Sequence, residues 1–152
     1  MREYIIKSTT AIILSSVIGL AGCSSSDSSA PPATPIGDIS GVWAISETTT
    51  SQTVGCSGFD SYDLTFAQNI NAVTITDEDS SVFNGTLSGN TLTWSGSFPE
   101  PPGTVSTNVT LTIDASCSAL SGSFTFTYSE TGFSCSGTAT ITGNRTSGGT
   151  SC

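Results

Sequence analysis

The side chains that could do chemistry in this chain are mostly acidic. Its 152 residues include twelve Asp and Glu, three Lys and Arg, and no His. A catalytic Ser or Cys usually needs a neighbouring base, and the only lysine is Lys7, close to the N-terminus. We therefore expect a protein that is not an enzyme and that needs no cofactor.

Paired carboxylates are the remaining route to acid–base catalysis. Asp60 and Asp63 flank the start of one expected strand, while Glu47, Glu100 and Glu130 are scattered along the chain. Nothing in this spacing brings two carboxylates into one cleft, so it does not indicate a catalytic pair.

An acidic run, Asp77-Glu78-Asp79, falls in an expected turn between two strands. Calcium takes several oxygen ligands that converge from a loop, and three adjacent acids supply some of them. The spacing is not that of an EF-hand, and a solvated acidic turn is the favoured interpretation. Asp77 and Asp79 are therefore only weak metal candidates.

The N-terminal segment indicates export. Arg2 and Lys7 precede an apolar run over residues 11–20. This run is shorter than the roughly 20 apolar residues that span a bilayer, and a basic start before a short apolar run is typical of a signal peptide. We therefore expect residues 1–22 to be a removed signal peptide.

The tetrapeptide Leu20-Ala21-Gly22-Cys23 resembles the lipobox of bacterial lipoproteins. The resemblance implies cleavage before Cys23, a lipid on its thiol and an acylated amino group. Two or more acyl chains hold a protein stably on a membrane. Ser24, where an Asp would favour the inner membrane, implies the outer membrane of a Gram-negative source. The alternative is an ordinary cysteine beside an ordinary cleavage site.

Cleavage at this point leaves an acidic chain. It removes Arg2, Lys7 and Glu3, so the net charge goes from −9 to −10 and Arg145 is the one remaining base. A basic surface is what nucleic acids require, so we exclude them as partners, whereas a cationic partner is allowed. Residues 23–37 are rich in Ser and Pro and are expected to form a disordered linker behind the anchor.

Residues 38–146 show a β pattern throughout, in which apolar and Ser or Thr residues alternate between turn residues. Short connections favour an eight-stranded antiparallel up-and-down barrel, with a β-sandwich as the alternative and residues 147–152 as a tail. The expected strands cover residues 40–50, 60–68, 71–77, 81–88, 90–98, 104–114, 120–129 and 134–145.

Gly41-Val42-Trp43 on the first expected strand resembles the Gly-x-Trp signature of lipocalins and related calycin barrels. In those families a Trp near the start of the first strand packs under an Arg from the last strand. The resemblance implies a cation–π contact between Trp43 and Arg145 that closes the barrel. The alternative role for Arg145 is to bind the anionic head of a ligand.

Four cysteines remain beyond Cys23, and an exported domain with an even number is expected to form disulfides. Three pairings are possible. If Trp43 lies opposite Arg145, residue 56 lies near residue 132. A last hairpin around residues 129–134, in which opposed residues sum to about 264, places residue 117 opposite about residue 147. This register predicts disulfides Cys56–Cys135 and Cys117–Cys152, whereas a zinc site is disfavoured by the long spacings and the lack of His.

These features predict a non-catalytic binding module that holds a small apolar ligand at the mouth of a lipocalin-like barrel. The alternative is an acidic interaction or inhibitor protein with a basic partner such as lysozyme. An interior filled by Trp43, Phe66, Phe124 and Phe126 would count against a ligand carrier.

Overall fold

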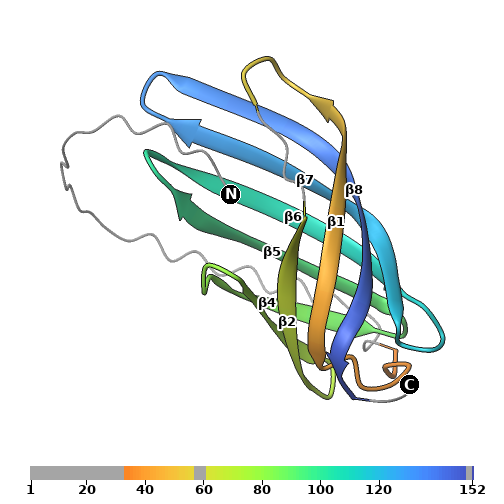
Figure 1. The fold of residues 1–152 in the computed structure, drawn as a ribbon. Helices are drawn as coiled ribbons and strands as arrows, with labels where there is room; N and C mark the ends of the chain where they lie inside the picture. Colours follow the sequence, from red (N-terminus) through yellow and green to blue (C-terminus); the bar gives the residue numbers. More distant parts are fainter. Residues whose placement is uncertain (1–32, 57–60, 150–151) are drawn as a thin grey trace, which may run out of the picture. The chain divides into compact units, whose positions relative to one another are not determined.

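The computed structural model describes residues 33–56, 61–149 and 152. Each strand pairs antiparallel with the next one along the chain, and β8 pairs with β1 to close the barrel (Figure 1). This confirms the up-and-down barrel and excludes the β-sandwich. Among the described residues, none forms a helix long and apolar enough to cross a membrane. The strands are β1 Gly41–Gln52, β2 Ser61–Asn69, β3 Ala72–Asp77, β4 Val82–Ser88, β5 Thr91–Glu100, β6 Gly103–Ile113, β7 Ala119–Glu130 and β8 Phe133–Gly148.

The alternating pattern of the sequence sets the two faces of each strand. On β6, Val109, Leu111 and Ile113 are buried, while Thr110 and Thr112 between them are exposed. Successive side chains of a strand point to opposite faces, and Thr and Val both suit extended backbone. The apolar set therefore fills the barrel and the hydroxyl set faces water.

Unequal strand lengths divide the barrel into two parts. The described pairing of β1 with β2 ends at Ser46 opposite Ser61, and that of β5 with β4 ends at Trp94 opposite Gly85. Past these points β5, β6, β7, β8 and β1 continue as a five-stranded sheet. We call this sheet the extension (residues 47–52, 95–100, 103–108, 125–130 and 133–140) and the remainder the ring. In Figure 1, β5, β6 and β7 run on past the short β2 and β4.

Aromatic side chains pack the interior. The ring centroids of Trp43 and Phe66 are 5.7 Å apart, and those of Phe66 and Trp94 are 6.4 Å apart. The rings of Phe124 and Phe126 are stacked, with their centroids 5.6 Å apart. All four residues named as possible fillers, Trp43, Phe66, Phe124 and Phe126, are buried. The ring is therefore packed by the side chains of its own strands.

Glycines on the inner face make room for these large rings. A Cβ atom on Gly96 would lie 2.5 Å from the ring of Phe83, and one on Gly137 would lie 2.6 Å from the ring of Phe126. Both distances are shorter than any van der Waals contact, so a side chain at either position would displace the neighbouring ring.

The disulfides are Cys56–Cys135 and Cys117–Cys152, with Cα–Cα distances of 5.7 and 5.3 Å. These are the pairs that the strand register predicts. The first joins the β1–β2 connection to the inner face of β8, and the second joins the β6–β7 turn to the C-terminal residue. A disulfide that closes a loop of this kind stabilises a fold by about 2–4 kcal/mol.

The last hairpin lies around residues 129–134, as expected. Glu130 lies opposite Phe133, so the turn consists of Thr131 and Gly132, and opposed residues sum to 263 against the expected value of about 264. Gly132 has φ of 81°, which a glycine adopts readily in a tight hairpin turn. This register suits the inner faces of both strands, because it places inward-facing Phe124 opposite inward-facing Ala139.

Candidate functional site

Arg145 connects the segment before the first strand of the barrel to the segment after its last strand. Its guanidinium carbon lies 5.3 Å from the centre of the Trp43 ring. Nη2 donates to the carbonyl of Asp38 at 2.6 Å, and Nη1 donates to the carbonyl of Gly149. Trp43 in turn donates from Nε1 to the carbonyl of Ile39 at 3.0 Å. The guanidinium thus connects the segment before β1 to the segment after β8, which is the position that barrel closure requires.

Asp38 shares this end of the barrel. Its pKa is lowered, chiefly by hydrogen bonds from Ser40 and to a lesser degree by the positive charge of Arg145. Because the terminal amino groups of the guanidinium already bind backbone carbonyls, the arrangement favours a structural role for Arg145 over the anchoring of an anionic ligand.

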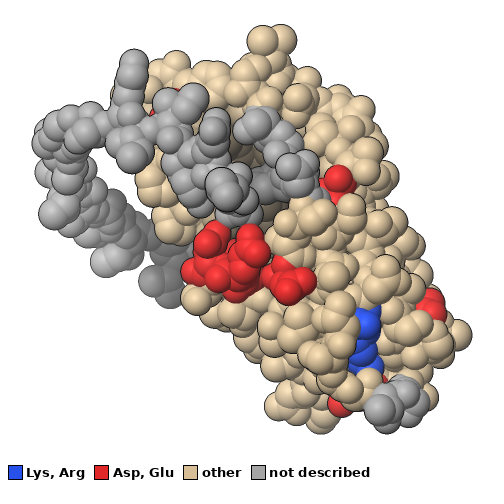
Figure 2. All heavy atoms as spheres, viewed as in Figure 1, with Lys and Arg blue, Asp and Glu red and all other residues tan. Residues whose placement is uncertain are grey.

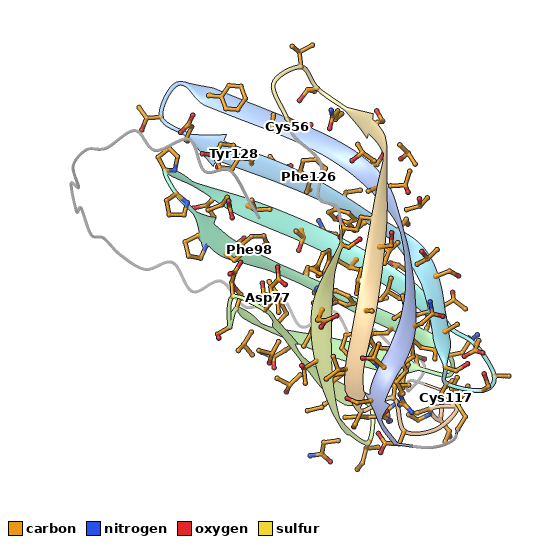
Figure 3. All side chains as sticks on the ribbon, viewed as in Figure 1. Cys56, Asp77, Phe98, Cys117, Phe126 and Tyr128 are labelled. Atoms are coloured by element: carbon orange, nitrogen blue, oxygen red, sulfur yellow. A yellow bond between two sulfur atoms is a disulfide. The ribbon has the colours of Figure 1, made fainter. Side chains whose placement is uncertain are left out.

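In the acidic turn, the carboxylate of Asp77 binds backbone groups of the same turn. Oδ1 of Asp77 accepts hydrogen bonds from the backbone N–H groups of Asp79 and Ser81, at 3.0 and 2.8 Å. In the described part of the chain, no three His, Cys, Asp or Glu residues are grouped so as to hold a metal ion. Figure 2 shows acidic atoms gathered on one face, where Figure 3 places Asp77.

The two aspartates considered for catalysis do not form a described pair. Asp63 is exposed on the outer face of β2, and Asp60 lies outside the described residues. So do Cys23, the expected signal peptide and the linker as far as residue 32.

Asp114 organises the turn between β6 and β7. It accepts hydrogen bonds from the backbone of Ala119 at 2.9 Å, from the backbone of Ser118 at 2.8 Å and from the hydroxyl of Ser116. These hydrogen bonds lower the pKa of Asp114 to about 2, and the bond from the backbone of Ala119 contributes most to this shift. The turn carries Cys117, which has a positive φ of 51°, so the carboxylate supports the backbone that presents this cysteine to Cys152.

The inner face of the extension combines a buried floor with a partly exposed rim. Phe98 and Tyr128 are half-buried and lie against the core, and Figure 3 shows them with Phe126 on the extended ends of β5 and β7. β2, β3 and β4 do not continue opposite this face. The floor consists of the buried residues Val105, Thr107, Phe126, Cys135 and Ala139. The rim consists of the half-buried residues Glu47, Tyr62, Phe98, Glu100, Tyr128 and Glu130.

Tyrosine–carboxylate pairs stand on this rim. The hydroxyl of Tyr62 donates to Glu47, and that of Tyr128 donates to Oε2 of Glu130 at 3.2 Å. The pKa of Tyr128 is raised, first by burial, then by its bond to Glu130 and by the negative charges of Glu130 and Glu100. The phenol of Tyr128 is therefore favoured in its neutral form, and Glu130 and Glu100 lie close enough to raise its pKa.

The sequence contained a signal for this rim that the search for catalytic pairs missed. Glu47 has the same parity as Trp43 and Ile45, and Glu130 has the same parity as Phe126 and Tyr128. Alternation therefore places these acids on the inner face. The alternation does not show where the neighbouring strands end, so the position of the rim could not be predicted from it.

No protein-family model, curated protein or solved structure matches this chain. The class of the protein follows from its fold, which is that of a closed eight-stranded antiparallel barrel with lipocalin-like up-and-down topology.

Proposed function

We propose that the chain is a lipid-anchored envelope protein whose barrel is a non-catalytic binding module for a small ligand with an apolar body. The observation that supports this most directly is the inner face of the extension, where the half-buried rings of Phe98 and Tyr128 lie above an apolar floor. Binding sites for small molecules are typically concave and mostly apolar, with a few polar groups that fix orientation.

The ring of the barrel is a poorer place for a ligand. Trp43, Phe66 and Trp94 occupy it and contact one another. A ligand there would have to displace packed side chains, whereas no described strand is paired opposite the extension. We therefore place the site at the extension, which corresponds to the mouth of the barrel.

The resemblance of residues 20–23 to a lipobox supports an anchor on Cys23 and a location in the cell envelope, with the outer membrane favoured by Ser24. An anchored module concentrates its ligand at the membrane surface and needs no catalytic group for this task. The scarcity of bases and the absence of His in the sequence agree with a non-catalytic role.

Native mass spectrometry of the full-length protein, purified from its own host, tests this function. We expect a retained small molecule that is lost in Phe98→Ala, because this change removes a ring from the inner face. Ser95→Ala is the matched control, since Ser95 lies on the exposed outer face of the same strand. Equal retention by both variants would place the ligand elsewhere.

A basic protein partner is the second candidate, and it is favoured by the acidic patch around Asp77 (Figure 2). Cleavage before Cys23 removes Arg2, Lys7 and Glu3 and takes the net charge from −9 to −10, and the long-range attraction of this charge for a basic protein is weakened by salt. Capture of lysozyme that disappears as salt is raised, and weakens in Asp77→Asn, would support this function. Capture that is indifferent to salt would contradict it.

A further inference from the structure

The described chain before β1 is fastened to one end of the barrel, at the turn between β4 and β5. The backbone N–H of Ala33 donates to Oγ of Ser88 at 3.0 Å, and its carbonyl accepts from the N–H of Gly89 at 3.2 Å. Ile36 donates to the carbonyl of Gly89 at 3.0 Å and packs against the core. The chain that leads back to Cys23 therefore leaves the barrel at this turn.

Side chains from β2 and the β2–β3 turn hold the same segment. Asn71 donates from Nδ2 to the carbonyl of Ala33 at 3.2 Å. Gln68 donates from Nε2 to the carbonyl of Gly37 at 3.1 Å, and its Oε1 accepts from the N–H of Ile39 at 2.8 Å. We call this end of the barrel the closed end. The extension forms the opposite end, because each strand that starts at one end finishes at the other.

The closed end and the tip of the extension are far apart. β7 runs from Ala119 at the closed end to Glu130 at the tip, which is about 37 Å along a strand. At the tilt that strands ordinarily have in a barrel, this is about 28 Å along the barrel axis. Cys23 precedes Ala33 by ten residues, which reach at most about 35 Å. A lipid on Cys23 therefore holds the closed end near the membrane.

The distribution of charge favours the same orientation. At the closed end, Arg145 offsets one of the two acids Asp38 and Asp114. The described part of the extension and of the β3–β4 turn carries six acids and no base, namely Glu47, Asp77, Glu78, Asp79, Glu100 and Glu130. Figure 2 shows the blue atoms of the one described base apart from the largest group of red atoms. Anionic headgroups act on charges within about a Debye length, roughly 8 Å, so they repel the end with the extension more strongly.

We propose that the barrel stands on the membrane on its closed end, so that the extension faces the aqueous compartment. The site on the extension then takes its ligand from water or from a soluble carrier, and not from the lipids around the anchor. This inference rests on the proposed function and specifies the source of the ligand of the same site.

Energy transfer to an acceptor lipid compares the heights of the two ends above the membrane. The full-length lipidated protein carries a fluorophore on an unnatural amino acid, which leaves both disulfides intact. One variant is labelled at Ile70, 77% exposed in the β2–β3 turn at the closed end, and the other at Thr131, exposed in the β7–β8 turn at the tip. In vesicles of phosphatidylcholine and phosphatidylglycerol, transfer should be strong from position 70 and weak from position 131, because the tip lies about 28 Å farther from the membrane.

Quenching by acrylamide, which is neutral and water-soluble, tests access from the aqueous side. Cys23→Ser lacks the lipid and is the matched unanchored control for each label. Anchoring should leave the quenching of the label at Thr131 unchanged and should lower that of the label at Ile70. A loss of quenching at Thr131 on anchoring would show that the tip faces the lipid and would overturn the orientation.

The outcomes separate this inference from the proposed function. Equal transfer from the two labels on vesicle-bound protein, or stronger transfer from Thr131, would overturn the orientation while leaving the anchor and the ligand site in place. Failure of the lipidated protein to bind vesicles would contradict the anchor and the orientation together. Ligand retention in Phe98→Ala does not depend on orientation, so the ligand site stands or falls by a different measurement.

Discussion

Replacing Arg145 by Ala tests whether its contacts close the barrel. The change removes the cation 5.3 Å from the Trp43 ring and the hydrogen bonds to the carbonyls of Asp38 and Gly149. It also leaves those two carbonyls without the donor that links the segment before β1 to the segment after β8. The first and last strands share the longest described pairing that joins distant parts of the chain, so the loss falls where closure depends on it.

The size of the effect follows from these contacts. A cation–π contact at a partly exposed site contributes about 1 kcal/mol. Hydrogen bonds from a charged donor contribute about 1.5–3 kcal/mol each. Since Arg145 is only half-buried, we take the lower end for both bonds and expect a net loss of about 3 kcal/mol after water replaces part of them. For a domain of this size that corresponds to a fall in Tm of about 10 °C.

Thermal unfolding followed by circular dichroism at pH 7, with the disulfides intact, measures this loss. Arg145→Lys keeps the charge but not the planar fork of donors, so it should fall between the parent and Arg145→Ala. Asn144→Ala, next to it on the exposed face of β8, is the control for a change at that position of the strand. If Arg145→Ala melts with the parent protein, the closure role is wrong and binding of an anionic ligand becomes the better account.

Three further predictions concern the acid limit, the anchor and a disulfide. The free energy of unfolding should fall as pH drops from about 4 to about 2, because the pKa of Asp114 is about 2 in the fold and 3.8 otherwise; urea unfolding of Asp114→Asn should show a smaller loss over that range, and an identical loss would contradict the assignment. Cys23→Ser should move the protein from the membrane fraction to the soluble fraction in its host, whereas unchanged fractionation would refute the anchor. Replacing Cys56 and Cys135 together by Ser should cost about 2–4 kcal/mol in urea unfolding, and unaltered stability would show that the β1–β2 connection is held without the bond.

Much of the fold could be predicted because its signals are local. Alternation along each strand is visible wherever Val, Leu or Phe is interleaved with Thr or Ser, as around Leu111 and Phe126. One long-range pair, Trp43 with Arg145, then fixed how the ends meet. From that register the cysteine partners followed, because the offset between β1 and β8 changes by only one residue at each of its two irregularities.

The extension could not be predicted in the same way. Its existence depends on where β2 begins relative to β1 and where β4 begins relative to β5, and these relations are set by pairing between strands. In the sequence Glu47 is therefore one of several scattered acids, although its parity with Trp43 indicates the inner face.

The acids on the inner face and the short strands explain each other. In a complete ring an inward carboxylate would lie among apolar side chains and would carry a large desolvation cost. Glu47 follows the last described pair of β1 with β2, and Glu100 and Glu130 end their strands beyond the described pairing of β4 with β5. Each is half-buried on the inner face, and the hydroxyls of Tyr62 and Tyr128 donate hydrogen bonds to Glu47 and Glu130. The positions of these acids therefore mark the part of the barrel where the described ring is incomplete, and the tyrosine hydroxyls there offset part of the cost of placing a carboxylate on the inner face.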